Sequence, residues 1–170
     1  MAFWSENSMA PMRNFRWQLQ IDGMGSDKVV YWAKTVSVPS FDVSETEHNY
    51  FDNKFFFPGR VTWTDVEVTM VDPVEPSSPK LLMEMLKTAG YNVPTAAGAK
   101  KTLSKKKSSS DGIKAVTLTL YDAEGDSKEK WVLKNPWIKA AKFGDMDYSN
   151  DDLREVSLTI KYDWAERTDT

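Results

Sequence analysis

The sequence predicts a mainly β protein: a small antiparallel β-barrel or sandwich of about eight strands with one flanking α-helix. Aromatic residues make up 12% of the 170 residues, a share that suits pleated, half-buried surfaces. Apolar and polar residues alternate in several segments separated by short turn-forming stretches, which favours antiparallel pairing. One segment has helical periodicity. The length suits a single domain that spans residues 1–170.

The first strands are predicted before residue 72. Alternation through residues 15–22, a glycine-containing turn and a returning strand at 29–36 predict a first hairpin. A mostly polar strand follows at 43–51. Phe55–Phe57 then precede Pro58–Gly59, a pair typical of type II turns. A further strand is expected at 61–72.

The helix is predicted from Pro79 to Ala89. Ser78 suits an N-cap and Pro79 the first helical position, where its missing N–H has no cost. Apolar residues then recur at helical spacing, and Gly90 suits the helix end. The helix is therefore expected to pack one apolar face on a sheet.

Four more strands are expected in the second half of the chain. Residues 116–121 and 128–134 form a predicted hairpin around a polar turn, and a shorter strand at 137–143 follows. Alternation predicts a final strand at 156–164 with Trp164 on its inner face.

A lysine-rich segment at about 94–112 interrupts the fold. It has no apolar period and is rich in Ala, Gly, Lys and Ser, so a flexible, solvated insertion is predicted that protease should cut first. Its position at an outer or ring-junction surface is also expected. Outside this segment the chain is acidic, which disfavours a nucleic-acid-binding module. The basic residues of the lysine-rich segment are Lys100, Lys101, Lys105, Lys106 and Lys107.

The composition excludes much enzyme chemistry. Without cysteine, no disulfide, thiolate metal site or cysteine nucleophile exists, and His48 is the one histidine. In a strand His48 points away from Glu45 and Glu47, which disfavours a metal site. Acidic residues at 145–152 lack calcium-loop spacing. We therefore expect no catalytic residue, metal or cofactor. Without a signal peptide or a long apolar run, a soluble, cytoplasmic protein is expected.

Phe55, Phe56 and Phe57 break the alternation of a strand with one buried face, so both sides of that strand need cover. The cover comes either from the same chain or from another subunit. Sequence alone leaves these two alternatives open.

The segment KFFFPGRVTWTDVEVTM at 54–70 resembles the strand, glycine-containing turn and strand of the T-even-type phage tail tube family. The following loop and helix, 71–89, occupy the same places as in that family. The opening at 14–39 and the closing block at 135–164 are also similar, so the resemblance covers nearly the whole chain. The lysine-rich insertion is the visible departure.

The resemblance implies a β-barrel subunit whose hexameric rings stack into the hollow inner tube of a contractile tail. The implied partners are the sheath, the tape-measure protein and the baseplate. DNA would pass through the lumen without specific binding, and the subunit would not insert into a membrane. The implied location is the virion tail tube, assembled in the host cytoplasm.

Related machines leave alternatives open. Type VI secretion and bacteriocin tubes share this plan, and a baseplate tube-initiator or a tail terminator has a related fold. A monomeric ligand-binding barrel is the alternative from another class. It would have no use for outward-facing phenylalanines.

Site residues follow for the tube hypothesis. The expected subunit interface is Phe55, Phe56, Phe57 and Trp63. Because DNA is densely negative, an acidic wall would keep it from binding during passage. The expected lumen residues are Glu45, Glu47, Asp65 and Glu67. An outward, solvated position for these carboxylates is the alternative, because alternation does not tell which way a face points.

Overall fold

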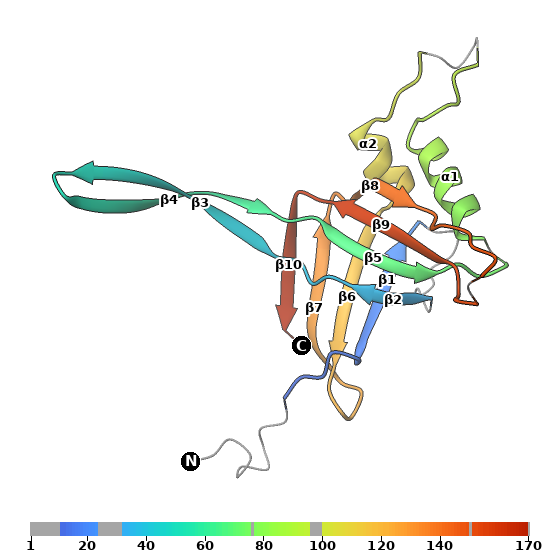
Figure 1. The fold of residues 1–170 in the computed structure, drawn as a ribbon, viewed down its shortest axis with the longest axis horizontal. Helices are drawn as coiled ribbons and strands as arrows, with labels where there is room; N and C mark the ends of the chain where they lie inside the picture. Colours follow the sequence, from blue (N-terminus) through green and yellow to red (C-terminus); the bar gives the residue numbers. More distant parts are fainter. Residues whose placement is uncertain (1–10, 24–31, 76, 96–99, 150, 170) are drawn as a thin grey trace.

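The computed structural model describes residues 11–23, 32–75, 77–95, 100–149 and 151–169. It confirms the mainly β fold class (Figure 1). The described part has one long helix, α1 (Ser78–Thr88), a short helix, α2 (Lys105–Lys107), and ten strands in place of the expected eight. The strands are β1 (Trp17–Asp22), β2 (Ala33–Val36), β3 (Phe41–Tyr50), β4 (Asn53–Trp63), β5 (Val66–Val71), β6 (Ala115–Tyr121), β7 (Ser127–Lys134), β8 (Trp137–Lys142), β9 (Glu155–Lys161) and β10 (Trp164–Asp169).

The described strands form two four-stranded antiparallel sheets and one separate hairpin. The first sheet has the order β1-β6-β7-β10, the second has the order β2-β5-β9-β8, and β3 pairs with β4. Strands of the two large sheets cross steeply in Figure 1, and the hairpin projects away from both. Neither large sheet closes on itself, so of the two predicted architectures the single chain is an open, sandwich-like one and not a barrel.

The core fills the space between the two large sheets. Alternate residues of β1, β5, β6 and β9 point inward and are almost fully buried, and Leu82 and Met85 of α1 pack against them. This is the burial pattern that period-two alternation predicts for strands with one covered face. The largest fully buried members are Leu19, Ile21, Met70, Leu82, Leu158 and Ile160.

The predicted first hairpin is wrong. β1 pairs with β6, with Trp17 opposite Leu120, whereas β2 pairs with β5, with Val36 opposite Val68. The two strands therefore lie in different sheets. Alternation identifies a strand but carries no information on its partner. Part of the predicted turn, 24–31, lies outside the described residues.

The predicted turn at Pro58–Gly59 is also wrong, because β4 continues through it. The ladder slips at this point, so that Glu45 lies opposite Pro58 but Val43 lies opposite Val61. This is a β-bulge, a position that tolerates proline and favours glycine. A Cβ on Gly59 would lie 2.3 Å from Ser44 Oγ, and the Arg60 N–H donates to that Oγ at 2.8 Å.

The predicted final strand at 156–164 is two strands in the structure. β9 ends at Lys161, and β10 begins at Trp164 in the other large sheet. The chain turns at Asp163, whose N–H donates to the Lys134 carbonyl at 3.0 Å. Trp164, expected on an inner face, is exposed.

Helix α1 is found one residue earlier than expected. Ser77, not Ser78, is the N-cap, and its side chain makes no capping hydrogen bond. The Ser78 N–H instead donates to the Asp72 carboxylate at 2.9 Å. A carboxylate at this end is favourable, because the free N–H groups there carry partial positive charge.

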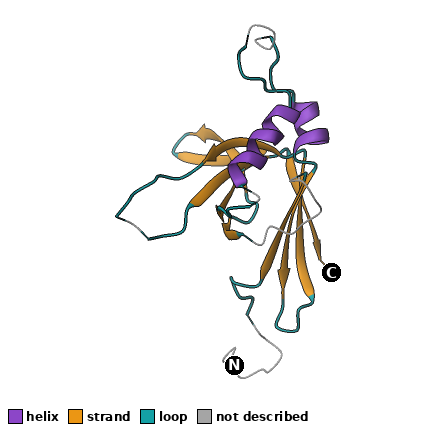
Figure 2. Ribbon diagram, turned by 90° about the vertical axis from the view of Figure 1, so that its right-hand side faces the viewer, coloured by secondary structure: helices purple, strands orange, loops and turns teal. Residues whose placement is uncertain are grey.

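The lysine-rich segment is more regular than expected. Lys105–Lys107 form α2, and Ser108–Gly112 form a π-helical turn. The prediction of an irregular chain through residues 105–112 is therefore wrong. The cause is tertiary: Ile113 is buried in the core, and Lys105 Nζ contacts Asp163 Oδ1 at 2.7 Å. Figure 2 shows both helices at one end of the sheets. Residues 96–99 lie outside the described part, and flexibility of the insertion stays a prediction.

Candidate functional site

The hairpin β3–β4 is the part of the chain with the least intramolecular cover. Every residue of β3 is exposed, and in β4 all but Trp63 are exposed. A two-stranded ribbon without a third strand or a covering helix is marginally stable at best in water. Its stability therefore depends on contacts beyond its own two strands.

Two faces of the hairpin follow from its register. Glu47 lies opposite Phe56 and Val43 opposite Val61, and directly paired residues point to the same side. We call this side the Phe56 face; its members include Val43, Glu45, Glu47, Phe56 and Val61. We call the other side the Phe55 face; its members include Thr46, His48, Phe55 and Phe57.

Both faces carry exposed apolar side chains. Phe56 is 56% exposed on one face, and Phe55 and Phe57 are exposed to a similar extent on the other. Covering one such ring is worth about 2 kcal/mol. An apolar surface of this kind marks an association site. Within the described part of the chain, nothing buries these three rings.

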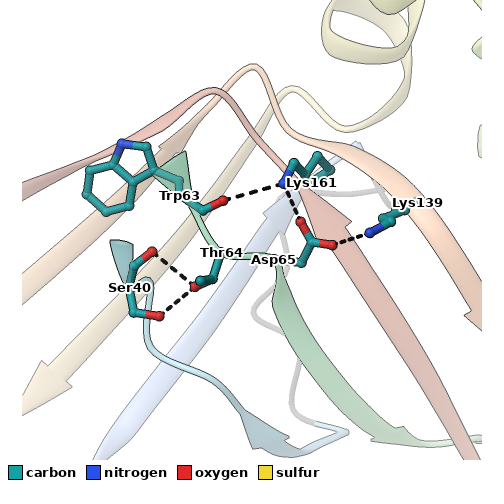
Figure 3. Close-up of polar contacts among 6 residues, drawn as sticks. All are labelled: Ser40, Trp63, Thr64, Asp65, Lys139 and Lys161. Carbon is teal, nitrogen blue, oxygen red and sulfur yellow. Dashed lines mark hydrogen bonds and ion pairs between the residues drawn. The ribbon is translucent and has the colours of Figure 1, made fainter. Parts of the chain in front are cut away.

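The root of the hairpin is held by aromatic packing and by short polar contacts, and Figure 3 shows the polar contacts. The Trp63 ring lies 5.4 Å from the Phe41 ring and 6.0 Å from the buried Tyr162 ring. On the other strand, the Ser40 carbonyl accepts hydrogen bonds from the Thr64 N–H at 2.9 Å and its hydroxyl at 3.0 Å. The hairpin therefore leaves the body in a fixed direction.

Asp65 adds an ion-pair cluster directly after the root. Its carboxylate lies 2.6 Å from Lys139 Nζ and 2.7 Å from Lys161 Nζ, and Lys161 also donates to the Trp63 carbonyl at 3.4 Å (Figure 3). Hydrogen bonds from Lys139 and Lys161 lower the pKa of Asp65. Burial, with a smaller effect from the Asp65 charge, raises the pKa of Tyr162 to about 12. The connection between β4 and β5 is thereby linked to β8 and β9.

Asp65→Asn is expected to destabilise the subunit by about 1 kcal/mol at pH 7, because two lysines lose their anion while remaining largely solvated. A lowered carboxyl pKa contributes stability above the unfolded value, near 3.9, that is lost as pH falls through the folded pKa. The difference between wild type and variant should therefore shrink below about pH 4. Urea denaturation at pH 7 and pH 3 measures both values.

The matched control is Asp145→Asn, which removes an exposed carboxylate from a loop. It should leave stability unchanged at both pH values. A difference between Asp65→Asn and wild type that is equally large at pH 3 contradicts an electrostatic role for Asp65.

The four predicted lumen residues do not form one cluster. Glu45 and Glu47 lie together on the Phe56 face, where Glu47 pairs with Lys54 at 3.0 Å. Asp65 pairs with its two lysines, and Glu67, the second residue of β5, is exposed. Predicted lumen and interface residues thus share the Phe56 face, which the sequence analysis had not anticipated.

The predicted interface residues and basic residues lie at separate places. Phe55, Phe56 and Phe57 are in the middle of the hairpin, and Trp63 is at its root. All five lysines are exposed: Lys105, Lys106 and Lys107 form α2, and Lys100 and Lys101 lie in the chain before it. Lys105 pairs with Asp163. Sequence reasoning missed Tyr50 and Phe51 at the hairpin tip; an aromatic pair ending a polar strand was the available signal.

The described residues hold neither a metal-binding cluster nor a membrane-spanning helix. No group of three or more His, Cys, Asp or Glu residues there is arranged to hold a metal ion. Likewise, the described helices include none that is both long enough and apolar enough to span a membrane.

Solved structures with the same fold come from contractile injection systems. A chain from the structure of the PVC sheath/tube terminator, part of an extracellular contractile injection system, matches with a TM-score of 0.69 at 15% identity, over 95% of this chain and 99% of that chain. A chain from the structure of the tube-terminating cap of the anti-feeding prophage matches with a TM-score of 0.69 at 13% identity, over the full length of both chains. A chain from the PVC sheath–tube complex matches with a TM-score of 0.64 at 14% identity, over 100% of this chain and 99% of that chain.

This chain has the contractile-injection tube fold. At these identities the likeness shows the fold alone. No family model and no curated protein matches the sequence. The tube fold here spans the full length of the chain, with the projecting hairpin as its least covered element.

Proposed function

We propose that the protein is a non-enzymatic structural subunit that self-associates into rings, which stack into the hollow tube of a contractile injection system. The observation that carries the proposal is the hairpin β3–β4, which exposes phenylalanines on both of its faces. A ribbon of this kind needs a surface on each side. Neighbouring copies of the same chain supply two such surfaces, and the tube fold supports this choice.

Open sheet edges support the same proposal. Within the described part, the first sheet ends on β1 and β10 and the second on β2 and β8. Exposed edges invite pairing with other chains, and closure of a sheet across subunits removes them. In a ring, each copy lends its sheet to a shared barrel whose interior is the lumen.

The finer proposal is a phage tail tube of hexameric rings inside a contractile sheath, built on a baseplate around the tape-measure protein and located in the virion. DNA passes through its lumen. Glu67 on β5 is the proposed acidic lumen residue, because its carboxylate repels phosphate. Glu45 and Glu47 lie on the same hairpin face as Phe56, a proposed interface residue, and are left out of this set. The carboxylate of Asp65 is neutralised by lysines and is left out of this set.

A terminator is the second candidate. Chains from the structures of a sheath/tube terminator and of a tube-terminating cap match with a TM-score of 0.69, and a chain from the sheath–tube complex matches with a TM-score of 0.64. A terminator subunit forms one ring and stops; a tube subunit continues.

Negative-stain electron microscopy and sedimentation of the concentrated protein, alone and with its baseplate, test the proposal. Stacked tubes are the expected result. Single rings that bind the ends of preformed tubes would instead support the terminator. A protein that remains monomeric at high concentration, with a baseplate present, contradicts both.

A further inference from the structure

An apolar cavity of about 410 Å³ lies beside α1, at the end of the sheets where the lysine-rich segment folds back. Its walls come from α1, from residues 103–113, from the start of β8 and from the chain after β9. Apolar side chains line most of it, among them Leu86, Leu103, Ile113, Trp137 and Ile138. An engineered cavity of about 150 Å³ already binds benzene, so this cavity has room for two aromatic rings.

The hairpin tip carries two aromatic residues, Tyr50 and Phe51, and the backbone of Phe51 is strained. Phe51 has a φ of 51° and is 88% exposed, although glycine, asparagine or aspartate is usual in a two-residue hairpin loop with positive φ. A bulky residue with this backbone conformation is an outlier. Its ring meets the exposed Tyr50 ring edge-on at 4.7 Å. The sequence thus keeps two aromatic rings in solvent at a position that would be less strained with glycine.

We propose that Phe51 and Tyr50 of one copy insert into the apolar cavity of a neighbouring copy. The inference rests on the proposed self-association and names its contact. Within one copy the hairpin carries its tip away from α1 and α2 (Figure 1), so the occupant is a second copy and not the chain's own tip.

Charge complementarity supports this occupant. Asp52 follows Phe51 at the tip. At the cavity rim Lys105 is already paired with Asp163, which also lines the cavity, and Lys106 and Lys107 follow with exposed side chains as the charges that face the tip. Docking the tip would place a carboxylate beside this basic rim as the rings enter the cavity. The basic segment thereby gains a function that needs no nucleic acid.

The length of the hairpin and the symmetry of the contact are also consistent with this proposal. Ten residues of extended strand span about 33 Å, which is far enough to cross from one subunit body to the next. Tip and cavity are different patches, so the contact is heterologous and repeats from copy to copy. Such contacts generate closed rings or open filaments, as tube growth requires.

Disulfide trapping tests the contact in the full chain, which has no native cysteine. We expect the double variant Phe51→Cys/Leu103→Cys, assembled and then treated with a mild oxidant, to give a ladder of covalent oligomers on a non-reducing gel. The control pair, Phe51→Cys/Glu124→Cys, places the second thiol in the exposed β6–β7 turn. It should give no ladder.

The outcomes separate this inference from the proposed function. Tubes or rings in the microscope without a ladder overturn the tip-in-cavity contact and leave self-association standing. A protein that gives neither assemblies nor a ladder overturns both. A ladder of equal yield from the control pair overturns the contact as well.

Phe51→Gly provides a second test because its two effects have opposite directions. Glycine relieves the backbone strain, so the midpoint of thermal unfolding of the free subunit should stay constant or rise. Loss of the buried ring should raise the concentration needed for assembly about tenfold. Unchanged assembly by this variant overturns the proposal.

Discussion

Phe56→Asp is expected to abolish assembly while the isolated subunit unfolds at an unchanged temperature. Phe56 is 56% exposed and contributes nothing to the core between the large sheets. In the proposed interface the new carboxylate would lose its water and lie on the same face as Glu45 and Glu47. Burying an unpaired charge costs several kcal/mol. Sedimentation velocity and thermal unfolding measure the two effects.

The matched control is Val74→Asp, which adds the same charge at an exposed apolar residue of the β5–α1 loop. It should assemble normally. If Phe56→Asp unfolds at a clearly lower temperature than Val74→Asp, the hairpin contributes to the subunit core and the interface assignment fails.

Ile160→Ala is expected to give the opposite pattern, with a large loss of subunit stability and retained assembly at low temperature. Ile160 is 0% exposed and lies in β9 between Val66 and Ile138 of the neighbouring strands. Removing a buried isoleucine side chain and leaving a cavity costs about 2–5 kcal/mol. Urea denaturation of the free subunit gives this value directly.

Thr159→Ala, on the other face of the same strand, is its control and should cost less than about 1 kcal/mol. A loss below 1 kcal/mol for Ile160→Ala would mean that the core tolerates collapse around β9. Normal stability together with failed assembly would place Ile160 at an interface, against its observed burial.

Local signals predicted the elements better than their partners. Alternation located β1, β6, β7 and β9, and the Ser-Pro pair located α1. Pairing was not available from the same signals, because β1 meets β6 in one sheet while β2 meets β5 in the other. Local sequence does not distinguish a proline at a bulge from a proline in a turn. The sequence analysis therefore predicted a turn at Pro58–Gly59, where β4 in fact continues.

The candidate site was predictable where the pattern itself was unusual. Three consecutive phenylalanines cannot all be covered by one sheet face, so Phe55–Phe57 stood out as rings that need cover on both sides of their strand. The sequence left open whether the same chain supplies that cover, and the structure shows all three rings exposed. The Asp65 cluster was not predictable, because Lys139 is 74 residues away in the sequence. The cavity was hidden for the same reason, since its walls come from distant segments of the chain.

The topology also sets an order of events when the chain folds. β3 and β4 are joined by two residues and can pair within microseconds, whereas β1 must find β6 across most of the chain. The hairpin can therefore pair before the body is complete, but it becomes stable only when its root packs on the body. Until then its phenylalanines are exposed and favour aggregation. Refolding yield should consequently fall steeply as protein concentration rises, and dilution should recover it.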